Sequence, residues 1–154
     1  MPFPLKSDES IYVEHKIKDG SYSMPTMQAA TDHYTMGYLV NGDRKWLSYE
    51  RIGIAHSGDV GINKPNVYHR NCALSDTPYD RYLIKFRLEV LQPVIDIIGQ
   101  SEFELLCSDY LHFTKASQKK IHAQFEEMLI EYNKHTPFSQ IILQGMLQKL
   151  FITV

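Results

Sequence analysis

Residues 58–69 read GDVGINKPNVYH and place a turn, a short strand and a corner in one stretch of the chain. Gly58-Asp59 is a turn signal, Val60 to Asn63 has the composition of a short strand, and Lys64-Pro65-Asn66 marks a corner. Such close spacing is typical of a small all-β unit. His69, which follows the corner, is open to three interpretations: a metal ligand, a binding-site residue, or an ordinary histidine at the end of a strand.

Short strands and turns extend on both sides of this segment. Tyr34 to Val40 is expected to be a strand closed by the turn Asn41-Gly42-Asp43, because Asn-Gly is the strongest short hairpin signal. Many short strands at this spacing predict a small antiparallel barrel or sandwich. Further strands are expected at Arg44 to Tyr49, Arg51 to Ala55 and Tyr79 to Phe86.

From about residue 88 onward, apolar residues recur at helical spacing. Pro93 predicts a break or a fresh helix start, and Gly99 predicts a helix end. Thr114 is a good N-cap for a long helix, and Thr136-Pro137 marks the start of the last one. The apolar stripe of the first long helix consists of Ile121, Phe125, Met128, Leu129 and Tyr132.

The last helix, from Phe138 to Val154, is apolar nearly all round. A helix with two apolar faces must be covered on both sides, so one face is expected to pack on its own domain and the other on a second copy of the chain. The alternative is that other helices of the same chain cover both faces. The residues predicted to form the homodimer interface are Ile142, Met146, Leu147, Leu150 and Phe151.

The composition fits one domain of ordinary size. Of the 154 residues, 44% are hydrophobic and 22% are charged, and the net charge is −2, which disfavours direct binding of nucleic acid. No apolar run approaches the ~18 residues of a membrane span, and the N-terminus lacks the apolar core of a signal peptide. The protein is therefore expected to be cytoplasmic, without a membrane partner, and with Cys72 and Cys107 as unpaired thiols.

The order of these features resembles the N-terminal cupin-like domain of AraC-family transcription regulators. The landmarks are Tyr34, YLVNG at 38–42, GDVGINKPNVYH at 58–69, PYDRYLIKF at 78–86, and the paired helices. The resemblance implies a mainly β fold with C-terminal helices: a small cupin-like antiparallel β-barrel followed by two long antiparallel helices. It also implies a domain that binds a small effector inside the barrel and dimerises through its helices.

In that family, a C-terminal region with two helix-turn-helix units binds promoter DNA, and residues 1–154 contain no counterpart of it. We therefore expect a single sensor domain, with the barrel at about residues 1–87 and the helical dimerisation part at about residues 88–154. We expect the chain to be a piece of a longer bacterial regulator, with a naturally short protein as the alternative. DNA would then be a partner only through the missing region.

Enzymatic cupins bind a divalent metal through two histidines, a glutamate and a further histidine, which must converge on one ion. By the spacing of that motif, the first two histidine positions fall on Ala29 and Thr31, and the glutamate position falls on Thr35. His69 alone keeps its place, although His33 could supply a second nitrogen after a shift of register. One histidine without a carboxylate does not make a transition-metal site, so we expect no metal, no cofactor and no catalysis.

A barrel without a metal still has a concave interior that can bind a small molecule. Alternation from Thr35 places Thr31 and His33 on the inward side, and Tyr34, Met36 and Tyr38 on the other. For Trp46 and Tyr82, packing in the core is an equally good interpretation. The predicted effector-binding residues are Thr31, His33, Thr35, Trp46, His69 and Tyr82.

Three functions remain open from the sequence. The first is an effector-sensing and dimerisation domain of a bacterial transcription regulator. The second is a small metal-dependent cupin enzyme, and the third is a dimerisation module without an effector.

Overall fold

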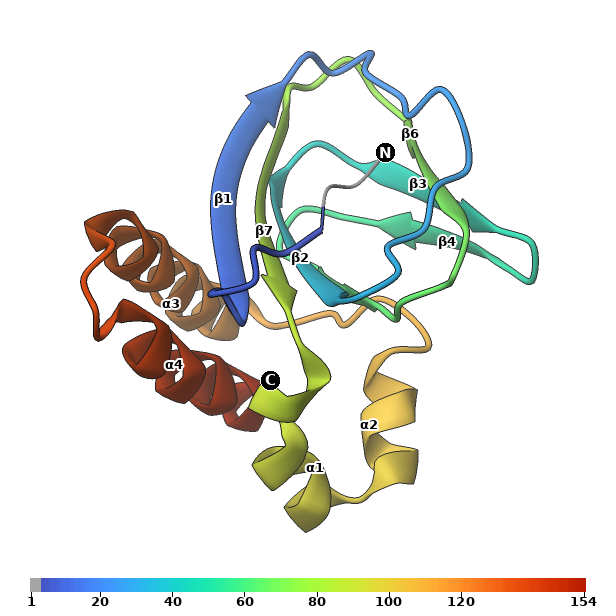
Figure 1. The fold of residues 1–154 in the computed structure, drawn as a ribbon. Helices are drawn as coiled ribbons and strands as arrows, with labels where there is room; N and C mark the ends of the chain where they lie inside the picture. The colour runs from blue at the N-terminus through green and yellow to red at the C-terminus, as the bar shows by residue number, and fades with distance from the viewer. Residues whose placement is uncertain (1–3) are drawn as a thin grey trace.

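The computed structural model, which describes residues 4–154, consists of two antiparallel sheets that face each other, with helices outside them (Figure 1). The four-stranded sheet has the order β1-β7-β2-β5, and the three-stranded sheet has the order β4-β3-β6. The strands are β1 (Ile11–Lys18), β2 (Tyr34–Asn41), β3 (Arg44–Ser48), β4 (Ile52–Ala55), β5 (Val60–Asn63), β6 (His69–Ala73) and β7 (Tyr79–Phe86).

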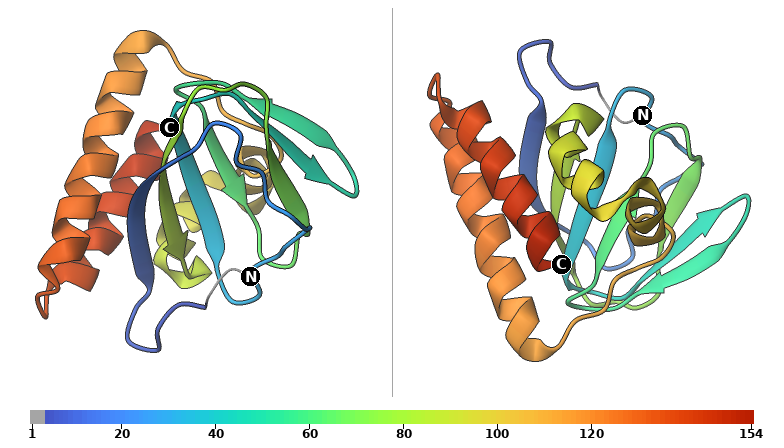
Figure 2. Two further views of the ribbon diagram at one scale, coloured as in Figure 1. Left: turned by 90° about the horizontal axis from the view of Figure 1, so that it is seen from above. Right: turned by 90° about the horizontal axis from the view of Figure 1, so that it is seen from below.

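The helices follow β7 and end in an antiparallel pair. A short 3₁₀ turn leads into two short helices, and the pair α3 and α4 then lies along the outer face of the four-stranded sheet (Figure 2). None of the helices in residues 4–154 is long and apolar enough to cross a membrane. The elements are η1 (Leu88–Val90), α1 (Gln92–Ile98), α2 (Gln100–Leu106), α3 (Lys115–Lys134) and α4 (Ser139–Thr153).

The main core lies between the four-stranded sheet and the helices. Strand β7 pairs with β1 on one side and with β2 on the other, so Phe86 lies opposite both Ile11 and Tyr34. Alternate β7 residues therefore point to the helices, where the Phe86 ring meets Phe151 of α4 and the Tyr82 ring meets Phe125 of α3. The remaining residues of β7 point to the space between the two sheets.

The predicted fold class, mainly antiparallel β-strands followed by two long helices, is confirmed. Within residues 4–154, the two sheets form an open, barrel-like arrangement that strand pairing does not close. Pro93 lies in the first turn of α1, Gly99 ends that helix with φ +95°, and the Thr114 side chain accepts a hydrogen bond from the Ser117 amide at the start of α3. Strands β1 and β6 were not predicted from the sequence. Both strands carry many polar residues, which is unusual for the inner wall of a small barrel.

The burial of α4 corrects part of the predicted dimer interface. Leu147 and Leu150 are fully buried and Phe151 is 4% exposed, because this face of the helix packs on the sheet of its own chain. Met146 is partly buried against the same core, and of the five predicted residues only Ile142 is exposed. The exposed apolar stripe of α4 consists instead of Phe138, Ile141, Ile142 and Ile152.

A pair of substitutions in α4 tests this assignment of faces. We expect Leu147→Ala to lower the free energy of unfolding by about 2–5 kcal/mol, since it leaves a cavity in the core. At a protein concentration low enough for the chain to be monomeric, Ile141→Ala, on the exposed stripe, should change that free energy by less than about 1 kcal/mol. Urea denaturation followed by circular dichroism measures both values. Equal losses for the two variants would contradict the assignment.

Candidate functional site

A cavity of about 330 Å³ lies between the two sheets. This volume is at the lower end of the roughly 300–1,000 Å³ that is usual for small-molecule sites. Both sheets contribute to its walls, and so does the segment between β1 and β2, through Tyr22, Met24, Gln28 and Ala30. The space is therefore shaped by parts of the chain that come together only in the folded barrel.

The cavity walls carry a marked excess of positive charge. Much of this charge comes from β1 and β7, because successive side chains of a strand point to opposite faces of the sheet. The apolar residues of these two strands face the helices, so the charged residues between them face the cavity. Among the described lining residues, six are lysine or arginine and two are aspartate or glutamate. The cations are Lys16, Lys18, Arg44, Lys64, Arg81 and Lys85, and the acids are Glu14 and Asp59.

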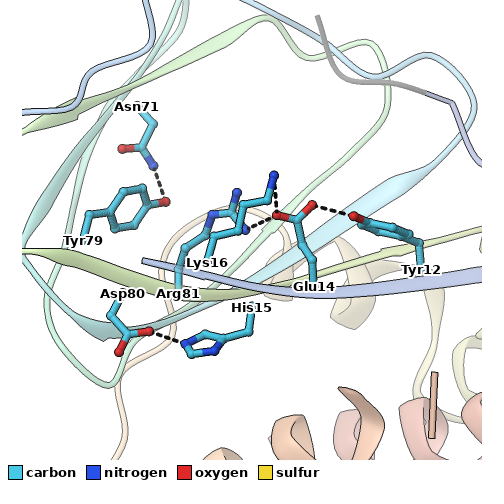
Figure 3. Close-up of polar contacts among 8 residues, drawn as sticks. All are labelled: Tyr12, Glu14, His15, Lys16, Asn71, Tyr79, Asp80 and Arg81. Carbon is cyan, nitrogen blue, oxygen red and sulfur yellow. Dashed lines mark hydrogen bonds and ion pairs between the residues drawn. The ribbon is translucent and has the colours of Figure 1, made fainter. Parts of the chain in front are cut away.

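Glu14 of β1 is the centre of a polar cluster inside the barrel (Figure 3). Its carboxylate lies 2.9 Å from Nη1 of Arg81 and 3.6 Å from Nζ of Lys16, and it accepts a hydrogen bond from the Tyr12 hydroxyl at 3.0 Å. Burial alone would raise the pKa of Glu14, but the Arg81 guanidinium and these hydrogen bonds hold that pKa below its ordinary value. Glu14 is therefore ionised and already engaged by cations.

Arg44 of β3 is the most enclosed cation of the wall. It is 2% exposed, its Nε donates to Oδ1 of Asn71 at 2.6 Å, and its guanidinium carbon lies 4.2 Å from the centre of the Tyr79 ring. Nη1 and Nη2 have no hydrogen-bond partner among residues 4–154. Burial lowers the pKa of Arg44, although an arginine stays charged at neutral pH.

Trp46 and His69 form an aromatic part of the wall. The two rings are stacked, with 5.8 Å between their centres and 15° between their planes. Nδ1 of His69 donates to the Val67 carbonyl at 3.1 Å, and burial lowers the pKa of the ring. His69 is therefore neutral at pH 7, and Nε2 is the ring nitrogen left to accept a hydrogen bond. The Trp46 indole N–H is buried and has no acceptor among residues 4–154.

The structure brings together half of the predicted effector-binding residues. Thr35, Trp46 and His69 line the cavity. Thr31 is exposed outside it, and His33 is buried beside Asp32, with 2.6 Å between Nδ1 and the carboxylate. Thr31 and His33 precede β2, which begins at Tyr34. The inward and outward alternation of a strand, from which their positions were predicted, therefore does not hold for them.

Tyr82 lies on the opposite face of the sheet, which corrects its predicted place in the pocket. Its ring is stacked on His15 at 4.3 Å and contacts Phe125 of α3 at 5.9 Å. The prediction placed the apolar face of β7 toward the cavity, as is usual for a barrel. Here α3 and α4 cover that face, so the charged face is the inner one.

Sequence reasoning missed most of the charged lining residues. The signal that could have found them is the alternation of β1, IYVEHKIK, in which Glu14, Lys16 and Lys18 share one face while Ile11 and Val13 share the other. Unless it is known that helices cover the apolar face, the charged side of such a strand is expected to face solvent.

Within residues 4–154, no three His, Cys, Asp or Glu side chains form a group that could hold a metal ion.

Comparisons with known proteins bear on the fold. No protein-family model and no curated protein matches the sequence. An apo form of ToxT from Vibrio cholerae strain SCE256 matches with a TM-score of 0.66 and 13% identity, over 96% of this chain and 56% of that one. The AraC-like transcriptional activator CuxR matches with a TM-score of 0.51 and 15% identity, over 80% of this chain and 44% of that one.

A cupin 2 conserved barrel domain protein from Salinispora arenicola CNS-205 has 17% identity and a TM-score of 0.45, over 62% of this chain and 75% of its own. Cupin-domain proteins and AraC-family regulators are thus both among the structures that resemble this chain. At these identities the likeness is one of fold. The chain spans about half the length of ToxT and of CuxR.

Replacing Glu14 with glutamine tests the charge balance of the cavity. We expect Glu14→Gln to lower the free energy of unfolding by about 2–4 kcal/mol at pH 7, because Arg81 loses its buried partner. The pKa of Glu14 in the folded chain lies below its ordinary value of 4.5, so its stabilising effect is complete above about pH 4.5 and is lost as the pH falls through the folded-state pKa.

The stability gap between wild type and Glu14→Gln should therefore be full at pH 7 and shrink as the pH is lowered below about 4.5. Urea denaturation at a series of pH values measures the gap. Lys45→Gln, on the opposite face of β3, is the control and should show no such pH dependence. A gap that stays constant down to acid pH would refute the role assigned to Glu14.

Proposed function

We propose that this chain is the effector-sensing and dimerisation domain of a bacterial AraC-family transcription regulator, and that the effector is a small molecule bound between the two sheets. The observation that carries the proposal is the cavity between the two sheets, whose walls combine aromatic rings with buried polar groups. The resemblance of the fold to ToxT and CuxR supports it. In such a regulator, contact with DNA is assigned to a part of the protein outside residues 1–154.

The alternative of a metal-dependent cupin enzyme has less support from the residues themselves. His69 is the only histidine among the described residues that line the cavity, and its Nδ1 donates a hydrogen bond to the backbone carbonyl of Val67. Glu14, the nearest equivalent of a carboxylate ligand in the barrel, is paired with Arg81 and Lys16. A cavity rich in ammonium and guanidinium groups also repels a divalent cation.

Dimerisation is the second part of the proposal. On α4, Phe138, Ile141, Ile142 and Ile152 form an apolar stripe whose members are 42% to 74% exposed. An apolar stripe on a helix is well suited to the same stripe of a second copy, because a two-fold axis brings identical surfaces together. The proposed interface thus keeps Ile142 from the sequence-based prediction and replaces its buried members.

The chain contains one tryptophan, Trp46, and it lies in the cavity wall, so its fluorescence should report on the effector. A compound bound in the cavity is expected to change the Trp46 emission and to raise the melting temperature through mass action. A screen over sugars, aromatic acids, fatty acids and nucleosides measures both signals. If no compound changes either signal, the proposal fails and the chain is better interpreted as a dimerisation module without an effector.

The dimer is tested by placing a charge on the stripe. We expect Ile141→Glu to shift the protein from dimer to monomer at equal concentration, because the two-fold axis brings two new carboxylates into one apolar contact. Light scattering coupled to size exclusion measures the mass. Lys120→Glu, on the exposed side of α3, is the matched control and should remain dimeric. A wild-type chain that is monomeric at high concentration, or an unchanged mass for Ile141→Glu, would contradict the interface.

A further inference from the structure

Two neighbouring side chains of β3 end in buried donors that lack acceptors. Arg44 and Trp46 are two residues apart on one strand, so they share the face that lines the cavity. Nη1 and Nη2 of Arg44 and Nε1 of Trp46 have no hydrogen-bond partner among residues 4–154. Unpaired buried donors are rare and costly, above all when one of them carries a charge.

The acids of the cavity do not neutralise Arg44. Glu14 is paired with Arg81 and Lys16, and Asp59 is paired with His112 at 2.7 Å. No ion pair within the described residues joins Arg44 to a carboxylate. Its guanidinium lies instead against the Tyr79 ring, which attracts a cation only weakly and offers no charged acceptor.

The guanidinium of Arg44 is held in a fixed orientation. Its Nε donates to Oδ1 of Asn71. Nδ2 of the same Asn71 amide donates to the Tyr79 hydroxyl at 3.4 Å, as Figure 3 shows. Because Nε is occupied, the edge formed by Nη1 and Nη2 is the one that remains for a ligand. Two parallel N–H groups of a guanidinium match the two oxygens of a carboxylate.

We propose that the cavity binds an organic carboxylate and that Arg44 is its anion-binding residue. This inference rests on the proposed function and specifies the chemistry of the effector. The Nη1 and Nη2 atoms are closed to solvent in the unliganded chain, and the Tyr22 ring lies 5.9 Å from the guanidinium. Tyr22 belongs to the irregular segment between β1 and β2, so the carboxylate reaches Arg44 by displacing this side chain.

The rest of the cavity fits an apolar body for this ligand. Beyond the charged residues, its walls present two leucines, two alanines, a methionine and several aromatic rings. A second acceptor on the ligand can take the free Trp46 N–H. The excess of lysine and arginine around the cavity adds a general attraction for an anion. The apolar wall includes Met24, Ala30, Leu39, Trp46, Ala55, Leu83 and Tyr110.

Isothermal titration calorimetry at pH 7 with benzoate, cyclohexanecarboxylate and octanoate tests the proposal. Each acid is compared with its neutral amide, and inorganic phosphate serves as an anion without an apolar body. At least one carboxylate is expected to bind, with its amide and phosphate at least about tenfold weaker, as expected when a charge-assisted hydrogen bond is lost. Equal binding of acid and amide, or no binding by any of the three acids, would overturn the proposal.

Arg44→Met gives the residue-level test. Its affinity for the carboxylate is expected to fall by about 10- to 100-fold, while its melting temperature without ligand stays equal or rises, since the variant removes a buried charge without a partner. A purely structural Arg44 would instead lower the melting temperature when replaced. Lys45→Met, the neighbouring residue on the opposite face of β3, is the matched control and should bind as wild type does.

The outcomes separate this proposal from the proposed function. If Arg44→Met binds the carboxylate with unchanged affinity, the assignment of Arg44 is overturned. If the acids fail but neutral compounds change the Trp46 emission, the sensing function stands and the carboxylate class is wrong. Should Arg44→Met not fold, Arg44→Lys replaces it: this variant keeps the charge but loses the paired N–H groups, and unchanged affinity for it would also overturn the assignment.

Discussion

The pairing of β7 with both β1 and β2 is the constraint on which the rest of the structure depends. It gives the four-stranded sheet two faces of opposite character. Ile84 and Phe86 are fully buried on the helix side, whereas Arg81 and Lys85 of the same strand line the cavity. Because a shift of one residue would exchange the two faces, the register that builds the core also sets the charge of the cavity.

This arrangement explains why the barrel interior can be polar. In a small barrel that stands alone, the interior is the only core available, so it must be apolar. Here α3 and α4 supply a second apolar layer outside the sheet (Figure 2). The stability of the domain then comes largely from the sheet-helix core, and the space between the sheets is left for charged groups such as Glu14 and Arg81. We infer that the fold separates stability from binding.

The sequence predicts most of the elements, although not β1 and β6, and it does not predict which of their faces are buried. Local signals depend on neighbouring residues only, and the Thr114 cap is confirmed. The chain also changes direction at Gly42, with φ +92°, but β2 and β3 belong to different sheets, so the hairpin that Asn41-Gly42 signals does not form. Which face of β7 lies inside depends instead on α3 and α4, which come much later in the chain, so the sequence alone predicts Tyr82 in the pocket and gives no sign that Arg81 lines it. The same limit applies to α4, where packing alone decides which of two apolar faces is buried, and Leu147 is buried within its own chain.

The central claim is that ligands enter the charged space between the sheets and meet Arg44 and Trp46. The most direct measurement is an NMR titration of ¹⁵N-labelled chain with octanoate, followed through the single Trp46 indole N–H and the N–H of the Arg44 Nε. We predict that both signals shift and saturate together, while backbone signals of α3 and α4 on the outer face of the sheet stay nearly unchanged. Shifts confined to the helices, with the Trp46 and Arg44 signals unmoved, would contradict the claim.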